Sequence, residues 1–333
     1  MVQSSGVIKM SKVIVQVLLL LLFISIGYIM ARSGKADKRH SKLLSVLGFY
    51  IFLPANVFKT FSNNFTVEYL SQKYTLIIIS AVFVVGMYLL GKPLAKLLTK
   101  QPYEQAVYRY SMISSNYGYV GYTLAQALFG DTMLLNVMMF ATPLSVYTYS
   151  LGYCSLTKNK VSFKKLMGPV NIALVAGAVV GLLKPYVVEL FTGYMPGFVD
   201  FISPVGRPAL DLINSFLNKA QGAMGPISML LTGMVIAEYD MKDMLTQRPV
   251  YLMTALRLLV IPIGVCSIIK LLGFEKDILT TVMIILALPC GLNTIVFPKL
   301  IGEDCKPGAA LACVTSVLCC VTIPFCLWLF GLY

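Results

Sequence analysis

Long apolar stretches recur along the whole chain and leave little room between them. Each is about 20 residues long, the length that a helix needs to cross a hydrocarbon core about 30 Å thick. They are continuously apolar, whereas the strands of a membrane barrel alternate apolar and polar residues over about ten positions. The sequence therefore predicts ten membrane-spanning helices, which are Val7–Met30, Leu43–Phe61, Tyr74–Leu97, Ala106–Phe129, Met133–Leu156, Leu166–Leu190, Leu210–Ala237, Val250–Leu272, Ile278–Leu300 and Gly308–Leu332.

The composition agrees with a chain that lies in a bilayer. Hydrophobic residues make up 58% of the 333 residues and charged residues 12%, whereas soluble domains are about 25% charged. The segments between the predicted spans are short, so we expect no soluble catalytic domain, nucleic-acid module, coiled coil or disordered tail within these residues. The predicted fold class is an all-α polytopic membrane protein.

Most of the Lys and Arg residues fall in alternate loops, and this predicts the orientation of the chain. A formal net charge of +13 would suit a nucleic-acid partner, but the basic residues concentrate in the loops after the odd-numbered spans. Cytoplasmic loops of membrane proteins are rich in Lys and Arg. We therefore expect both termini on the extracytoplasmic side, a plasma-membrane location and no nucleic-acid partner. The first stretch lacks a convincing cleavage site and is interpreted as a span, not a signal peptide.

The eight cysteines and the single histidine do not predict a metal site. Most of the cysteines fall inside predicted spans, the chain has no Cys-X-X-Cys motif, and such cysteines commonly act as small apolar packing residues. His40 lies in a basic loop. Because the spans offer no Ser/His, Cys/His or His/Asp/Glu set, we expect no metal, no cofactor and no enzyme activity.

A basic loop at residues 157–165 separates two groups of five predicted spans. Five crossings return the chain on the opposite side of the membrane. A duplicated second half would therefore be inverted relative to the first, as in many secondary transporters. The sequence thus predicts two inverted repeats, at residues 1–156 and 166–333.

Two predicted spans contain residues that interrupt a helix. The fourth span has glycines and an asparagine between Ser114 and Thr123, and the ninth has proline, glycine and asparagine between Ala287 and Thr294. Free backbone groups at membrane depth cost several kcal/mol each unless protein, water or ligand satisfies them. Crossed half-helices that meet near the midplane would form a site for a small molecule or an ion. Alternatively, both interruptions are kinks that neighbouring helices satisfy, with the asparagines bonded across helix interfaces.

Motifs along nearly the whole chain resemble the auxin efflux carrier family, which is related to the bile-acid transporter class. The motifs are Phe52-Leu53-Pro54-Ala55, Asn116 to Gly121, Ala127 to Gly130, Gly168 to Ala173, Gly225 to Gly233, Arg257 to Pro262, and Ala287-Leu288-Pro289 with Asn293. The resemblance implies a scaffold of spans 1, 2, 6 and 7, a transport unit of spans 3–5 and 8–10, and a crossover of spans 4 and 9 that holds substrate.

The resemblance also implies the residues of this crossover site. They are Asn116, Gly118, Gly121, Pro289, Gly291 and Asn293, with Tyr117, Tyr119, Tyr122 and Cys290 beside them. Family members often carry a proline shortly after the glycine of span 4, but this chain has Gly121-Tyr122-Thr123 there. We therefore expect the break in span 4 to rest on its glycines.

Several other polar residues are candidates for contact with an ion or a substrate. Candidate sodium or substrate contacts in the broken spans are Ser114, Ser115 and Thr294. In the outer part of span 7 the candidates are Asp211, Lys219 and Gln221. Alternatively, these three are interfacial residues at the mouth of that span. We expect Arg109 and Arg257 to extend to the cytoplasmic headgroups.

The predicted function is a secondary transporter that carries a small organic anion, such as a carboxylate, by an elevator-like movement of the transport unit. No acidic residue lies near a span centre, so we do not expect carboxylate-based proton antiport. An inside-negative potential favours anion exit by about 2.3 kcal/mol per charge per 100 mV, which is sufficient for uncoupled efflux. The alternatives are a sodium-coupled symporter and a membrane receptor that binds a ligand without moving it. A homodimer through the scaffold helices is a further expectation.

Overall fold

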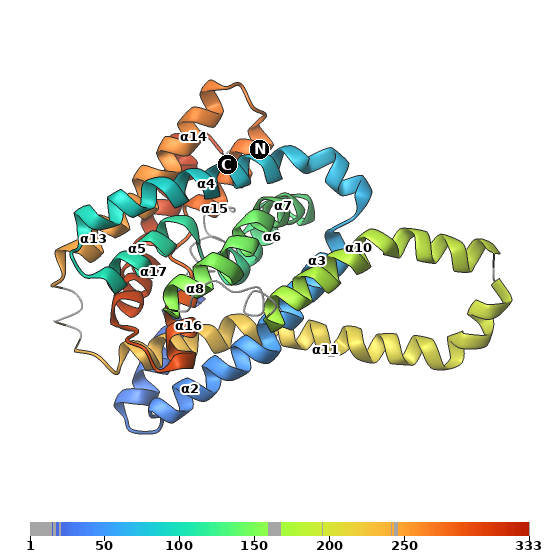
Figure 1. Ribbon diagram of the computed structural model, residues 1–333, viewed down its shortest axis with the longest axis horizontal. Coiled ribbons are helices and arrows are strands. Elements are labelled where there is room, and N and C mark those ends of the chain that lie inside the picture. Colours follow the sequence, from blue (N-terminus) through green and yellow to red (C-terminus); the bar gives the residue numbers. More distant parts are fainter. Residues whose placement is uncertain are drawn as a thin grey trace.

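The structure, a computed structural model, describes residues 15, 18, 19, 21–158, 168–194, 196–240, 242 and 246–332 (Figure 1). Every regular element in these residues is a helix. The first half contains the helix Leu21–Arg32, α2 (Lys38–Leu47), η1 (Gly48–Phe52), α3 (Leu53–Asn64), α4 (Val67–Leu98), α5 (Pro102–Ile113), η2 (Tyr117–Gly121), α6 (Tyr122–Phe129), α7 (Asp131–Tyr147), η3 (Thr148–Gly152) and α8 (Tyr153–Leu156). The second half contains α10 (Pro169–Tyr194), α11 (Pro196–Ile236), α13 (Arg248–Ala255), η4 (Leu256–Val260), α14 (Ile261–Leu271), α15 (Lys276–Leu286), α16 (Asn293–Ile301) and α17 (Lys306–Leu329).

Five helices in the described part are long and apolar enough to cross a membrane. They are Lys38–Asn64, Val67–Leu98, Pro169–Val187, Arg248–Leu271 and Lys306–Leu329, and they coincide with predicted spans 2, 3, 6, 8 and 10. The apolar helix Leu21–Arg32 is shorter, and the beginning of predicted span 1 lies outside the described residues. Spans 4 and 9 contain breaks, so neither forms one helix of full length. The arrangement of ten spans in two inverted repeats remains a prediction.

Capping residues and prolines mark where several helices begin. The Asp37 carboxylate accepts hydrogen bonds from the backbone N–H groups of Arg39 at 2.8 Å and His40 at 3.3 Å, and so caps α2. The Thr66 hydroxyl accepts from the Tyr69 N–H at 3.2 Å and caps α4. Helices α5, α13 and α17 carry proline in the first turn, where its missing N–H costs no intrahelical bond.

Helix Leu21–Arg32 crosses α11 with glycine on both sides of the contact. A Cβ atom at Gly27 would lie 2.2 Å from the carbonyl oxygen of Leu230, and one at Gly233 would lie 1.9 Å from that of Ile24. Both distances are shorter than a non-bonded contact allows. The close approach of these two backbones therefore requires glycine at both positions, as is common where membrane helices cross.

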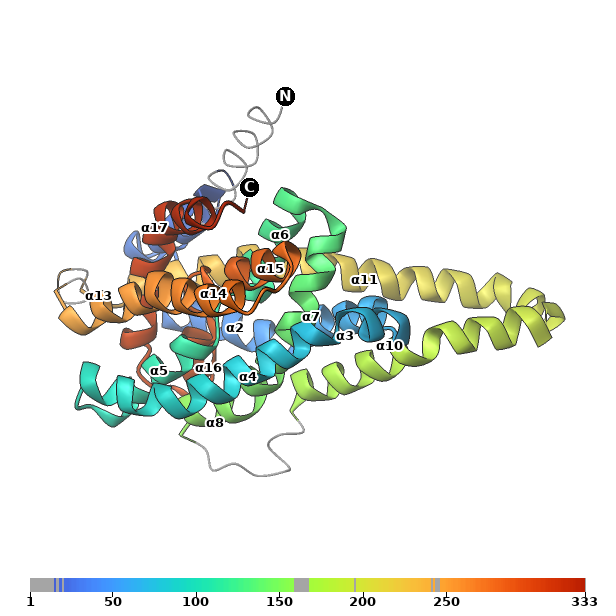
Figure 2. The same ribbon diagram turned by 90° about the horizontal axis from the view of Figure 1, so that it is seen from above.

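Helices α10 and α11 extend away from the remaining helices (Figures 1 and 2). They carry large apolar side chains that are strongly exposed, including Val175 at 52%, Tyr186 at 57% and Leu212 at 72%. Near the body of the molecule, α3 packs against both α10 and α11. Exposed apolar surface of this kind suits contact with lipid tails.

Candidate functional site

The break in span 4 falls on Ser114, Ser115 and Asn116, between α5 and η2. Ser114 is extended, with φ −97° and ψ 119°, and Asn116 has φ −81° and ψ 48°. The expectation that this break rests on glycines is wrong, because Gly118 and Gly121 lie inside the π-helical turn η2. Glycine is needed where the backbone adopts a positive φ. Ser114 and Asn116 both have negative φ, so the helix can break here without glycine when another segment supplies the backbone hydrogen bonds.

That other segment is the break in span 9, which separates α15 from α16. The Asn116 N–H donates to the Pro289 carbonyl oxygen at 3.0 Å, and the Gly291 N–H donates to the Ser114 carbonyl oxygen at 3.3 Å. Together these bonds form an isolated antiparallel bridge between Ser115 and Cys290. The two interrupted stretches therefore meet, and each satisfies backbone groups that the other leaves free.

Side chains from surrounding helices hold this crossover. On the span 9 side, the Thr315 hydroxyl of α17 accepts from the Cys290 N–H at 3.2 Å, and the Asn293 amide nitrogen donates to the Tyr110 hydroxyl at 3.2 Å. On the span 4 side, the Ser114 hydroxyl lies 2.9 Å from the Thr148 hydroxyl, and the Tyr117 hydroxyl lies 2.9 Å from the Ser145 hydroxyl. Thr294 bonds within its own turn, to the Gly291 carbonyl oxygen at 2.9 Å.

Some polar groups at the crossover are buried without a partner in the described part of the chain. Both polar atoms of the Asn116 amide, the Asn293 amide oxygen and the Ser115 hydroxyl make no hydrogen bond there. Asn116 is 2% exposed and Asn293 7%. Because an unpaired buried polar group costs about 1–3 kcal/mol, these atoms are available to pair with the polar groups of a small ligand. They provide both donors and acceptors.

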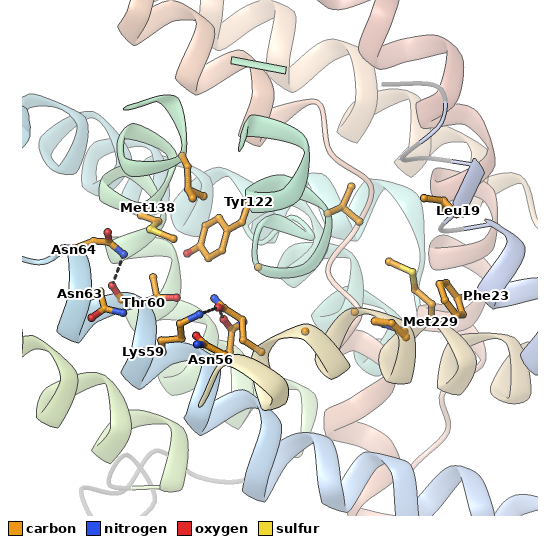
Figure 3. A pocket seen from close by; sticks show the side chains of 18 residues that line it. Leu19, Phe23, Asn56, Lys59, Thr60, Asn63, Asn64, Tyr122, Met138 and Met229 are labelled. Atoms are coloured by element: carbon orange, nitrogen blue, oxygen red, sulfur yellow. Dashed lines mark hydrogen bonds between the residues drawn. The ribbon is translucent and has the colours of Figure 1, made fainter. Parts of the chain in front are cut away.

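A cavity of about 630 Å³ lies beside the crossover (Figure 3). One wall comes from α3, α11 and the first helix, and the other from η2, α6 and α7. The described residues that line it are Leu19, Phe23, Asn56, Lys59, Thr60, Asn63, Asn64, Gly118, Val120, Tyr122, Leu134, Met138, Asn218, Gln221, Gly222, Gly225, Pro226 and Met229. Figure 3 shows Tyr122 and Met138 facing the polar side chains of α3 across this space.

The predicted site residues divide between the crossover and the cavity. Gly118, Tyr122 and Gln221 line the cavity, whereas Asn116 and Asn293 lie buried at the crossover and do not line it. Asp211 and Lys219 are exposed and lie outside the cavity lining. Tyr119 belongs to η2, and the position of its side chain is outside what the structure describes.

The sequence analysis missed Asn56 and Lys59 on α3. The Lys59 ammonium donates to the Gln221 amide oxygen, and the Gln221 amide nitrogen donates to the Asn56 amide oxygen at 3.0 Å. Lys59 is the one charged residue in predicted span Leu43–Phe61. That signal was present in the sequence, because a charged residue inside a membrane span is commonly functional.

Arg109 and Arg257, which were expected to extend to the headgroups, both contact other helices. Arg257 is fully buried in η4, so that expectation is wrong for this residue, because η4 packs against α5 and α17 in the interior. Arg109 donates from Nε to the Tyr88 carbonyl oxygen at 3.0 Å, and its guanidinium carbon lies 3.7 Å from the centre of the Tyr88 ring. It therefore binds α4.

Comparison with known proteins identifies the family of this chain. The sequence matches the family described as "Membrane transport protein" over residues 12–161 and 155–327. The chain belongs to this family of membrane transporters. The match also confirms the resemblance to the auxin efflux carrier family. An uncharacterized transporter from Methanocaldococcus jannaschii is 23% identical over 321 residues, covering 94% of this chain and 97% of that protein.

The family and this relative are transporters, which supports the prediction that the chain is not an enzyme. Together with the apolar helices, they also support an integral membrane location for this transporter.

Proposed function

We propose that the chain is a secondary transporter for a small organic anion, with the crossover as part of its substrate site. The observation that carries this proposal is the pairing of the two breaks, which leaves the buried Asn116 amide and the buried Asn293 amide oxygen without partners in the described part of the chain, beside a cavity. A ligand that enters between the two groups of helices would satisfy those groups.

The charges around the site favour an anion over a cation. Lys59 is the only charged residue among the described residues that line the cavity. Helix α16 begins at Asn293, and the partial positive charge of a helix N-terminus attracts anions. Carboxylates, which accept several hydrogen bonds, match this set of amide and ammonium donors.

The packing of the helices supports movement of one group against the other. One group contains α4, α5, α7, α13, α14, α15 and α17. Within it, α4 packs against α5 and α7, α15 packs against α7 and α14, and α17 packs against α13. The helices α2, α3, α10 and α11 form the opposite group. Elevator-like alternating access, in which the broken helices move relative to the scaffold, is the proposed mechanism. The exposed apolar faces of α10 and α11 make a homodimer through these helices part of the same proposal.

The test of this function is a flux measurement with purified protein in liposomes. Labelled monocarboxylates and dicarboxylates are loaded inside, and their loss is followed under an imposed membrane potential. We expect loss through the parent protein, and a decrease of about tenfold or more in Asn116→Ala, because this variant removes an unpaired amide donor to a charged ligand. We expect a similar decrease in Asn293→Ala, because this variant removes the bond to Tyr110 that holds the crossover.

The control is Asn136→Ala. Asn136 is a buried asparagine of α7 whose amide oxygen accepts from the Tyr69 hydroxyl at 3.1 Å, and it lines neither the crossover nor the cavity. Parent-like flux in both crossover variants would overturn the proposed site. Binding without flux would favour the receptor, and flux that requires sodium would favour the symporter, through Ser114, Ser115 or Thr294.

A further inference from the structure

We propose that Lys59, together with Asn56 and Gln221, forms a carboxylate-binding site on the scaffold wall of the cavity. In the absence of substrate, the Gln221 amide oxygen accepts the hydrogen bond that the Lys59 ammonium would donate to the substrate carboxylate. This inference rests on the proposed function and assigns the group that neutralises the substrate charge.

The three residues lie on two helices that face the same cavity. Asn56 and Lys59 are three positions apart on α3 and therefore share a helix face, and Gln221 approaches them from α11. The contacts run from the Lys59 ammonium to the Gln221 oxygen, and from the Gln221 nitrogen to the Asn56 oxygen at 3.0 Å. Asn56 is buried at 6% exposure, and all three line the cavity (Figure 3).

Lys59 is charged, but the group that it binds, the amide oxygen of Gln221, is neutral and stabilises the charge less than a carboxylate would. Gln221 presents a neutral amide oxygen, and no Asp or Glu belongs to the described lining of the cavity. A carboxylate adds the attraction between two opposite charges, which a neutral amide oxygen does not supply. A carboxylate in the cavity would therefore displace the Gln221 oxygen, and the freed amide of Gln221 would remain bonded to Asn56 or turn to the ligand.

Thr60 provides a second and independent indication that a ligand binds here. Its hydroxyl is buried and has no hydrogen-bond partner in the described part, although the residue lines the cavity next to Lys59. Thr60 is 5% exposed. A ligand oxygen held by Lys59 would place an acceptor near this unused donor.

The opposite wall limits the kind of carboxylate that fits. Tyr122 and Met138 face the polar side chains of α3 across the cavity, the aromatic ring and the thioether providing apolar surface (Figure 3), and Val120 belongs to the same lining. The site therefore suits a carboxylate whose remaining part is partly apolar, with the charged end at Lys59. Asn63, Asn64 and Asn218 surround the same wall with amides, which would orient a second polar group.

The experiment measures ligand-dependent thermal stabilisation of the purified protein by phenylacetate and by succinate, each beside its uncharged amide. Lys59→Met should weaken carboxylate binding by about tenfold to 100-fold and leave the response to the amides unchanged. Lys59→Arg, which keeps the charge, should retain most of the binding. Lys219→Met is the matched control, since Lys219 is an exposed lysine of α11 that does not line the cavity.

A second variant keeps the test independent of how well Lys59→Met folds. Gln221→Glu places a permanent carboxylate on Lys59, so it should bind the probes as weakly as Lys59→Met while remaining as stable as the parent without ligand. Parent-like binding and flux in both variants would overturn this inference and leave the proposed function intact. If the parent itself neither binds nor moves any of these carboxylates, both proposals are wrong.

Discussion

Arg257 is a buried cation whose guanidinium nitrogens make no hydrogen bond in the described part of the chain. The side chain is fully buried in η4, and arginine does not lose its proton in proteins. The free energy of desolvating this group is therefore uncompensated by a neighbouring side chain or carbonyl. Unlike Lys59, it lines no described cavity.

Arg257→Met should consequently stabilise the protein. Methionine has nearly the same volume, and replacing buried charged groups by apolar ones is often stabilising by about 1–4 kcal/mol. Thermal unfolding in detergent measures the effect, with Arg248→Met, an exposed arginine at the start of α13, as the neutral control. A lower melting temperature for Arg257→Met would mean that an unseen anion or partner compensates the charge.

At the scale of single elements, glycine residues decide how closely the helix Leu21–Arg32 and α11 approach each other. Gly27 and Gly233 lie at this contact, and each faces a carbonyl oxygen of the other helix. A side chain at either position has no space unless the two helices separate. Separation would also move the Gln221 side chain of α11, and with it the wall of the cavity.

Gly233→Ala should therefore reduce the stability of the protein by about 1–3 kcal/mol, the usual cost of overpacking. Gly264→Ala on α14 is the matched control, because a Cβ atom there would meet nothing within 4 Å. Alanine in place of an exposed helical glycine is expected to be neutral or to stabilise by up to about 1 kcal/mol. Equal melting temperatures for the two variants would contradict the packing argument.

At the scale of the whole molecule, a polar network links the two groups of helices near the C-terminal end of α11. Glu238, just after α11, pairs with Lys299 of α16 and accepts from the Ser41 hydroxyl at 3.0 Å. The Tyr239 hydroxyl donates to Asp304 at 2.7 Å and accepts from the Cys305 N–H at 3.0 Å. The proposed movement of the broken helices against the other group would require these contacts to open.

The rate at which the buried Cys305 thiol reacts with a maleimide should measure how often these contacts open. Burial raises the pKa of its thiol to about 12, so below that pH the group is protonated and reacts slowly, since only the thiolate is nucleophilic. Glu238→Gln and Tyr239→Phe should open the network, lower the pKa of Cys305 toward its ordinary value, and increase maleimide labelling as the pH rises from about 7 to 9.

Mass spectrometry of the Cys305 peptide quantifies this labelling. Glu275→Gln, which changes an exposed acid before α15, is the control and should label as slowly as the parent. Fast labelling of the parent protein, or equally slow labelling of both network variants, would show that the network does not control this movement.

The presence of an interruption in each of two spans was predictable from local sequence, and the hydrogen bonds that join the two interruptions were not. Pro289 and Gly291 identify the interruption in span 9 because they weaken a helix wherever they stand, whereas Gly118 of span 4 lies in the π-helical turn that follows the break. The position of the first break, at Ser114–Asn116, was not predictable, because it depends on hydrogen bonds to Pro289 and Gly291 in the other half of the chain.

The sequence by itself determined that this chain lies in a membrane as long helices, since continuous apolar stretches with few charges are stable only there. It also determined which two helices break. Only the tertiary structure decided that the breaks pair, that Lys59 meets Gln221 across 162 positions of sequence, and that Arg257 is buried. The physical reason is that apolar length acts locally, whereas a hydrogen-bond partner depends on which distant segments packing brings together.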